Sequence, residues 1–170
     1  HPVLRAALAS WLTRTRGALA TPDAIHVTGG VSHAMWLLAH VLGASAWAVE
    51  RPGSAGTWHV LRQVVECLPV RLDAAGMVPG DIPEASGAVL VTPSHQYPTG
   101  SMMPAERRRA VVDACRRAGR WLVEDDFDSH LAEPGVVPGA MQALAPDGVV
   151  LMRSLSKLMA PGLRLGWIVA

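Results

Sequence analysis

The sequence has 170 residues but no asparagine, and it contains only one lysine, one tyrosine and one phenylalanine. Arginine supplies the other fourteen of its fifteen Lys and Arg side chains. Either residue serves on a solvated surface, but a guanidinium stays protonated and cannot act as a nucleophilic amine. Lys157, the single lysine, is therefore either a chance survivor or the one position where an amine is required.

Cysteines and long apolar runs are also scarce, and each absence excludes a class of protein. The two cysteines, Cys67 and Cys115, lie far apart, which excludes a disulfide framework and a zinc cluster and favours a reducing cytoplasm. There is no stretch of about 18 apolar residues, so we expect no membrane span. A net charge of +1 gives no general attraction to nucleic acid, and a composition that is 50% hydrophobic excludes a disordered chain.

Helical and strand-like patterns alternate along the chain, which predicts an α/β fold. We expect residues 1–170 to form a single domain, since there is no internal repeat and no low-complexity linker. The absence of an initial methionine, and an end that falls within a predicted strand, suggest an excerpt from a longer protein. The predicted helices are 2–12, 30–38, 57–66 and 104–117, and the predicted strands are 25–28, 46–49, 70–72, 88–91, 121–123, 149–152 and 165–169.

Polar and glycine residues follow the ends of several predicted strands. In an open α/β sheet a ligand binds beyond the carboxyl ends of the strands, where those ends meet at one edge. The sequence therefore predicts a binding site at this edge. The residues concerned are Gly29, Gly30, Glu50, Thr92, Asp125 and 154–157.

The segment from Ser154 to Lys157, with Arg164 seven residues further on, is the sharpest of these signals. We expect a lysine just past a buried strand to be desolvated, which lowers its pKa and frees the amine to attack a carbonyl. Hydroxyl groups and a planar guanidinium are suited to binding phosphate. The alternative is a solvated lysine in a surface loop.

A second phosphate cradle is predicted at Gly30, Val31 and Ser32, where a helix begins. Free backbone N–H groups and the positive end of the helix dipole attract an anion, and glycine allows it to approach closely. A Gly-Gly pair before a helix is also typical of a simple turn, so this signal depends on a partner site.

Residues 124–128 place four acids in five positions at the end of a predicted strand. Three interpretations are open: a solvated acidic loop, a metal site, or a site with one buried carboxylate that keeps a pyridine nitrogen protonated. No His or Cys stands at metal-ligand spacing beside these acids, so we expect no metal. The arginines of the helix over 104–117 are expected to form a solvated outer face.

Three motifs in the same order resemble one family. They are T-P-S-H-Q-Y-P-T-G at 92–100, E-D-D-F-D at 124–128, and S-L-S-K with P-G-L-R at 154–164. The chain resembles the large domain of fold-type-I pyridoxal-phosphate (PLP) enzymes of the class I/II aminotransferase group. Within that group it is similar to the aminotransferase-like half of MocR regulators of the GntR superfamily. The resemblance implies a three-layer α/β/α PLP-dependent transferase large domain with a mostly parallel central sheet.

The resemblance also implies a role for each matching residue. Lys157 would hold PLP as a Schiff base and act as the catalytic residue of a transaminase. Asp125 would pair with the pyridinium nitrogen, with Asp126 as a near alternative. The residues implied to bind the phosphate are Gly30, Val31, Ser32, Ser154, Ser156 and Arg164.

Two positions depart from the family pattern. Ser54 stands where the family has a tyrosine that stacks on the cofactor ring, and Phe127 replaces a tyrosine that bonds the cofactor's phenolic oxygen. Each loss costs about 1 kcal/mol. Tyr97 would partly compensate, so we expect these changes to weaken PLP binding without abolishing it, and to impair turnover more than binding.

Three functions follow as hypotheses. The first is a PLP-binding effector domain of a MocR/GntR-type transcription regulator, which would respond to a small amine or amino acid. The second is a catalytically active aminotransferase acting on an amino acid, and the third is a cofactor-free dimerisation scaffold. The family implies a cytoplasmic homodimer, with DNA bound only by a winged helix-turn-helix domain before residue 1 and with a small C-terminal domain after residue 170.

Overall fold

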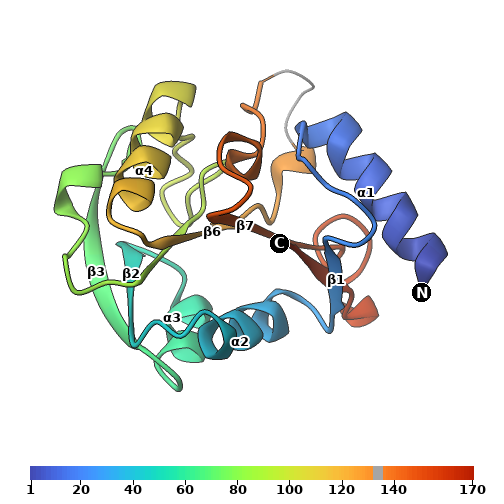
Figure 1. Ribbon diagram of the computed structural model, residues 1–170, viewed down its shortest axis with the longest axis horizontal. Coiled ribbons are helices and arrows are strands. Elements are labelled where there is room, and N and C mark those ends of the chain that lie inside the picture. Colours follow the sequence, from blue (N-terminus) through green and yellow to red (C-terminus); the bar gives the residue numbers. More distant parts are fainter. Residues whose placement is uncertain (132–135) are drawn as a thin grey trace.

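An eight-stranded sheet runs through the middle of the computed structural model, which describes residues 1–131 and 136–170 (Figure 1). The strands lie in the order β1-β8-β7-β6-β5-β2-β3-β4. Their bounds are β1 Ile25–Thr28, β2 Ala46–Arg51, β3 Glu66–Asp73, β4 Gly76–Met77, β5 Ala88–Val91, β6 Trp121–Asp125, β7 Val149–Ser154 and β8 Gly166–Val169.

The central strands are parallel, as the sequence predicts. β3, β2, β5, β6 and β7 pair in parallel with their neighbours. β8 pairs antiparallel with β7 and with β1, and β4 pairs antiparallel with β3. The carboxyl ends of the five parallel strands therefore meet at one edge of the sheet.

Helices cover both faces of the sheet, so the three-layer prediction is confirmed (Figure 1). One face is covered by α2 (Val31–Val41) and α3 (Ala55–Leu61), and the other by α1 (Pro2–Arg16) and α4 (Ala105–Arg117). Short 3₁₀ helices span Pro79–Asp81, Ser129–Leu131, Met141–Leu144 and Pro161–Leu163. Within the described ranges no helix is long and apolar enough to cross a membrane.

The prediction of a helix over 57–66 is wrong at both ends. Ser54 caps α3, because its Oγ accepts a hydrogen bond from the backbone N–H of Thr57 at 3.3 Å. The chain leaves the helix after Leu61, and Glu66 already pairs with Ala46 in the sheet. Pairing with β2 thus overrides the local helical pattern.

Alternate residues of β6 enter different cores. Val123 packs in the cluster that contains Met35 of α2, whereas Leu122 packs in the cluster that contains Val111 of α4. Because side chains alternate along a strand, Asp125 follows Val123 toward the α2 and α3 face. Glu124 belongs to the opposite face.

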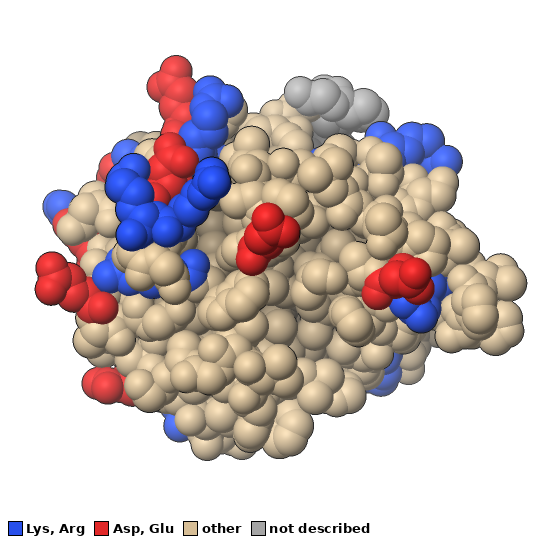
Figure 2. Space-filling model, viewed as in Figure 1, with Lys and Arg blue, Asp and Glu red and all other residues tan. Residues whose placement is uncertain are grey.

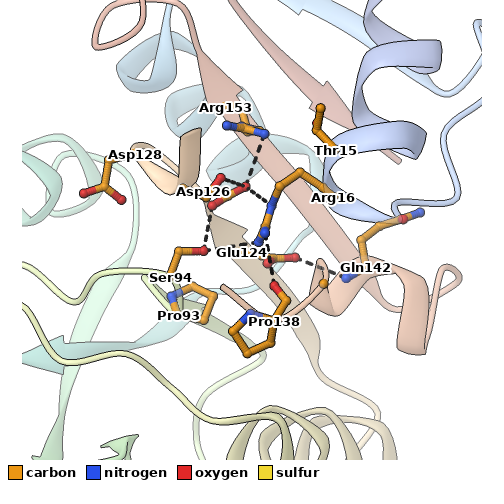
Figure 3. Close-up of polar contacts among 12 residues, drawn as sticks. Thr15, Arg16, Pro93, Ser94, Glu124, Asp126, Asp128, Pro138, Gln142 and Arg153 are labelled. Atoms are coloured by element: carbon orange, nitrogen blue, oxygen red, sulfur yellow. Dashed lines mark hydrogen bonds and ion pairs between the residues drawn. The ribbon is translucent and has the colours of Figure 1, made fainter. Parts of the chain in front are cut away.

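A buried ionic cluster lies on that opposite face, beyond the end of β6 (Figure 3). The Asp126 carboxylate accepts hydrogen bonds from Arg16 Nε at 2.8 Å, Ser94 Oγ at 2.7 Å and Ser129 Oγ at 2.8 Å, and Arg153 Nη1 lies 3.4 Å away. Burial by itself would raise the pKa of Asp126, but Arg153 and Arg16 lower it overall. The cluster fastens α1, the loop after β5 and the ends of β6 and β7 together.

Arg108 joins this region from α4, and the prediction that it belongs to a solvated face is wrong. Its side chain is buried and donates hydrogen bonds to the carbonyl groups of Met103, Gly139 and Pro93. Its Nη1 also lies 3.7 Å from Glu124, whose pKa burial and the Asp126 charge raise to about 7. Arg107 is half-buried and bonds Asp73 and the Met77 carbonyl, so it departs from the prediction too. Arg109, Arg116 and Arg117 are exposed as predicted, and charged side chains of both signs gather over this helix in Figure 2.

We predict that Arg16→Met destabilises the fold by roughly 3 kcal/mol, because removing one partner of a buried ion pair leaves its counter-charge poorly compensated. Arg14→Met is the matched control, since Arg14 lies on the same helix and is exposed. The free energy of unfolding from urea titration measures both. Equal stability losses in the two variants would contradict this account of the cluster.

Candidate functional site

A cleft of about 650 Å³ opens at the carboxyl ends of the parallel strands, on the side covered by α2 and α3. The structure brings most of the sequence-predicted residues to its wall, although they come from five separate segments. Those that line the cleft are Val31, Ser32, Tyr97, Asp125, Ser154, Ser156, Lys157 and Arg164. Thr92, noted from the sequence as a strand-end residue, also lines it, as do Met35 and Val60, which polar patterns could not identify.

Asp125 is the buried acid of the cleft. Its side chain alternates with those of Glu124 and Asp126, so it lacks their arginine partners. The Oδ1 atom has no hydrogen-bond partner among residues 1–131 and 136–170. Burial, followed by the charges of Asp126 and Glu50, raises the pKa of Asp125 to about 8.

Asp126 was the near alternative from the sequence, and the structure places it outside the cleft. It is absent from the cleft wall and bonds Arg16 and Ser94 on the other face of the sheet (Figure 3). Of these two neighbouring acids, only Asp125 can face a ligand in the cleft.

A second group of residues at the cleft is suited to binding an anion. Gly30 caps the start of α2 with a φ of +102°, and a Cβ at this position would lie 3.4 Å from the Arg164 guanidinium. Arg164 therefore lies against the N-terminus of α2, where backbone N–H groups are free. Ser154 and Ser156 add hydroxyl groups to the same wall. Gly30 itself lies behind Arg164 and does not line the cleft.

A glycine is also required at position 166, where β8 packs against the backbone before α2. A Cβ on Gly166 would lie only 2.8 Å from the backbone of Gly30. Gly166 pairs with Thr28, the last residue of β1, so the antiparallel β1–β8 contact brings Arg164 to the start of α2.

Lys157 lies in the cleft wall, but the prediction that it is desolvated is wrong for this structure. The residue is exposed, as are Leu158, Met159 and Leu163 around it. The turn after β7 carries it beyond the sheet edge, where the described residues leave one side of the cleft open. An exposed amine is accessible to a carbonyl compound entering the cleft.

Both positions that depart from the family pattern line the cleft. Ser54 uses its hydroxyl to cap α3 and offers no ring for stacking. Phe127 is half-buried and offers no hydroxyl to a ligand. Tyr97 is 56% exposed at the cleft wall.

Each polar side chain of the S-H-Q segment contacts a different acid. Ser94 donates to Asp126, the His95 ring lies 3.0 Å from Asp128, and Gln96 donates to Glu50. Glu50 is buried, and burial raises its pKa. Its Oε2 also accepts a hydrogen bond from Thr92 Oγ1 at 2.5 Å. The sequence marked Glu50 only as a strand-end residue, and no pattern indicated its link to the S-H-Q segment.

Among the described residues, no group of three His, Cys, Asp or Glu side chains could hold a metal ion. The four acids at 124–128 are instead divided between the two faces of the sheet.

Comparison with known proteins gives one family. The sequence profile of "Aminotransferase class I and II" matches residues 1–170. The chain is 38% identical over 170 residues to the HTH-type pyridoxine biosynthesis transcriptional regulator PdxR of Corynebacterium glutamicum, covering 98% of this chain and 37% of that protein. It is 37% identical to the HTH-type transcriptional regulator TauR of Rhodobacter capsulatus, covering 91% of this chain and 33% of that protein. The chain thus spans about a third of the length of these relatives.

Solved structures share the fold. An archaeal alanine:glyoxylate aminotransferase superposes with a TM-score of 0.90 at 24% identity, over 99% of this chain and 45% of that one. LysN, an α-aminoadipate aminotransferase from Thermus thermophilus complexed with N-(5'-phosphopyridoxyl)-L-leucine, superposes with a TM-score of 0.85 at 26% identity, over 100% and 45% of the chains.

We predict that Asp125→Asn flattens the pH dependence of stability. Because folding raises the pKa of Asp125 from 3.8 to about 8, the folded state favours its protonated form. Its contribution to stability is complete below about pH 4 and is lost as the pH rises to about 8. The amide cannot ionise, so without added ligand the variant should exceed the parent at pH 8 by a few kcal/mol, at about 1.4 kcal/mol per pKa unit.

Urea titrations from pH 4 to 9 measure this difference. Asp113→Asn, at an exposed position of α4, is the control and should follow the parent curve. If the free energy of unfolding depends on pH in the same way for the parent and for Asp125→Asn, then Asp125 ionises freely in the folded chain and this account is wrong.

Proposed function

The chain belongs to the class I and II aminotransferase family, and on this basis we propose that it binds pyridoxal 5'-phosphate in the cleft and acts as the effector-binding part of a MocR-type transcription regulator. The observation that carries the cofactor proposal is the buried, unpartnered Oδ1 of Asp125, for which residues 1–131 and 136–170 provide no donor. PLP would supply an electron sink at its protonated pyridine ring.

Two sets of polar groups in the cleft fit PLP. A protonated pyridine nitrogen would give Asp125 the donor that it lacks, and the positive ring would favour the ionised carboxylate. Ser154, Ser156 and Arg164, with the N-terminus of α2 beside Gly30, would hold the phosphate. An unpaired buried acid and a set of anion-binding groups in one cleft match a ligand that has both a donor and a phosphate.

Lys157 would bind the aldehyde of PLP through its Nζ. It is the only lysine in the chain, it lines the same cleft, and it lies between the two serines and Arg164 in the sequence. Ser54 and Phe127 remove a stacking surface and a hydrogen bond, so we expect weaker PLP binding than in relatives that carry both tyrosines.

Two observations favour a regulator. The T-P-S-H-Q-Y-P-T-G segment, which resembles that of MocR regulators, contributes Thr92, Tyr97 and Pro98 to the cleft wall. Several of the most similar relatives are HTH-type regulators. We propose that a small amine or amino acid acts as the effector, that two copies of the chain associate in the cytoplasm, and that DNA is bound by residues outside this chain.

An active aminotransferase is the second candidate. It is favoured by the intact set of Lys157, Asp125 and Arg164 around one cleft. A scaffold without cofactor is the third candidate, favoured by Ser54 and Phe127.

We predict that PLP becomes covalently attached to Lys157. Borohydride reduction of the protein with PLP should make the bond permanent, so that peptide mass spectrometry finds one phosphopyridoxyl group on the peptide containing Lys157. Lys157→Arg keeps the positive charge but cannot form the bond, and it should lose both the label and the visible absorbance band. Lys157 is the single lysine of these 170 residues, so label found only outside the peptide containing Lys157 would refute specific binding and leave the cofactor-free scaffold.

Turnover separates the regulator from the enzyme. We expect amines and amino acids to change the PLP absorbance spectrum without producing pyridoxamine phosphate. The reason is that Ser54 lacks the aromatic ring that would stack on the cofactor and Phe127 lacks the hydroxyl group that would hydrogen-bond to it. Chromatography of the released cofactor after incubation with a panel of amino donors measures this conversion. Stoichiometric pyridoxamine phosphate with any donor would favour the aminotransferase instead.

A further inference from the structure

Gln96 is buried beside the cleft but does not line it. Its Nε2 donates its two hydrogens to the carbonyls of Pro52 at 2.9 Å and Tyr97 at 2.7 Å, and Oε2 of Glu50, at 3.3 Å, shares one of them. Its Oε1 accepts hydrogen bonds from Thr99 N at 3.1 Å and Thr99 Oγ1 at 2.7 Å. Backbone carbonyls on one side and a backbone N–H on the other fix the orientation of the amide.

These bonds join two loops that wall the cleft. The loop after β2 contributes Gly53 and Ser54 to the wall, and the loop after β5 contributes Thr92, Tyr97 and Pro98. The Gln96 amide reaches the first loop at the Pro52 carbonyl and the second at the Tyr97 carbonyl. A glutamine is suited to this position because one side chain supplies two N–H donors and an acceptor.

Glu50, near the end of β2, is held by two residues of the loop after β5. Its Oε2 accepts bonds from Thr92 as well as Gln96, while its buried Oε1 has no hydrogen-bond partner in the part of the chain that the structure describes. No ion pair compensates Glu50 within the same residues, and the charge of Glu50 in turn raises the pKa of Asp125. A second carboxylate beside Glu50 would therefore be strongly disfavoured unless the pair shared a proton.

We propose that Gln96 is a positioning residue for the cofactor cleft, which holds the Tyr97 loop and the 51–54 loop together through its bonds to Pro52, Tyr97 and the buried Glu50. The consequence for binding rests on the proposed function, because PLP is the ligand whose site these loops wall. The link between the loops themselves does not depend on the cofactor.

Gln96→Glu tests the link directly. It keeps the shape of the side chain but replaces the donor by an oxygen that faces Glu50 and the carbonyls of Pro52 and Tyr97. Hydrogen–deuterium exchange without PLP should become faster in both 51–54 and 92–100. The affinity for PLP at pH 8 should fall about tenfold or more, since each lost buried hydrogen bond is worth about a factor of five to ten.

A pH series distinguishes positioning from loss of packing. At lower pH the carboxyl group introduced by Gln96→Glu can share a proton with Glu50, so the PLP affinity of the variant should recover relative to that of the parent. Measuring the parent at the same pH values corrects for the titration of Asp125. Adding Glu50→Gln to Gln96→Glu supplies an amide partner for the new carboxylate and should recover part of the affinity at pH 8. Gln63→Glu makes the same chemical change at an exposed position and is the matched control.

Thr99→Val keeps the proposal testable should Gln96→Glu fail to fold. It removes one of the two bonds to Gln96 Oε1 and should accelerate exchange in both segments by a smaller factor. Exchange in 51–54 equal to that of Gln63→Glu, or a loss of affinity independent of pH and of Glu50→Gln, would overturn the proposal. Failure of the parent to bind PLP would refute the proposed cofactor, while the exchange measurement would still decide the role of Gln96.

Discussion

The carboxylate of Asp126, held by Arg16 and Arg153 in the protein interior, is the interaction on which the rest of the cleft depends (Figure 3). A buried charge is costly unless it is paired and hydrogen-bonded, and Asp126 is both. The bonds come from α1, from the loop after β5 and from β7. The end of β6 is therefore fixed at the point where the next residue back, Asp125, turns to the other face of the sheet.

This arrangement gives two adjacent acids opposite properties. Asp126 receives charge compensation that lowers its pKa, and Asp125 receives none, so burial raises its pKa to about 8. The uncompensated acid lies in the cleft wall, while Arg164 lies at the start of α2. The cleft thus leaves Asp125 Oδ1 without a donor among the described residues and offers Arg164 beside the free N–H groups of α2. A purely apolar ligand would leave both groups unsatisfied.

The sequence predicts the carboxyl ends of the parallel strands to within two residues, although it misses the first four residues of β3. A buried parallel strand has a strong local pattern, and its carboxyl end has a known role. The sequence does not predict burial of individual charges. Arg108 belongs to a helix rich in arginine and becomes buried because Pro93 and Gly139, distant in sequence, bring their carbonyls to it. Lys157 follows a buried strand but is exposed, because the turn that carries it leaves the sheet. Both outcomes depend on tertiary contacts that no local pattern contains.

The choice between arginine and lysine follows the same physical distinction. Arg16 and Arg108 each donate to three different acceptors inside the protein, which the planar guanidinium permits in one fixed geometry. Their charge also persists when they are buried, so they can compensate Asp126 and Glu124. Lys157 makes no ion pair among the described residues, and its surroundings are open. An arginine would serve equally well there as a solvated cation. The proposed bond to the aldehyde of PLP is what would require a lysine, since an amine can lose its proton and form a bond to carbon whereas a guanidinium cannot.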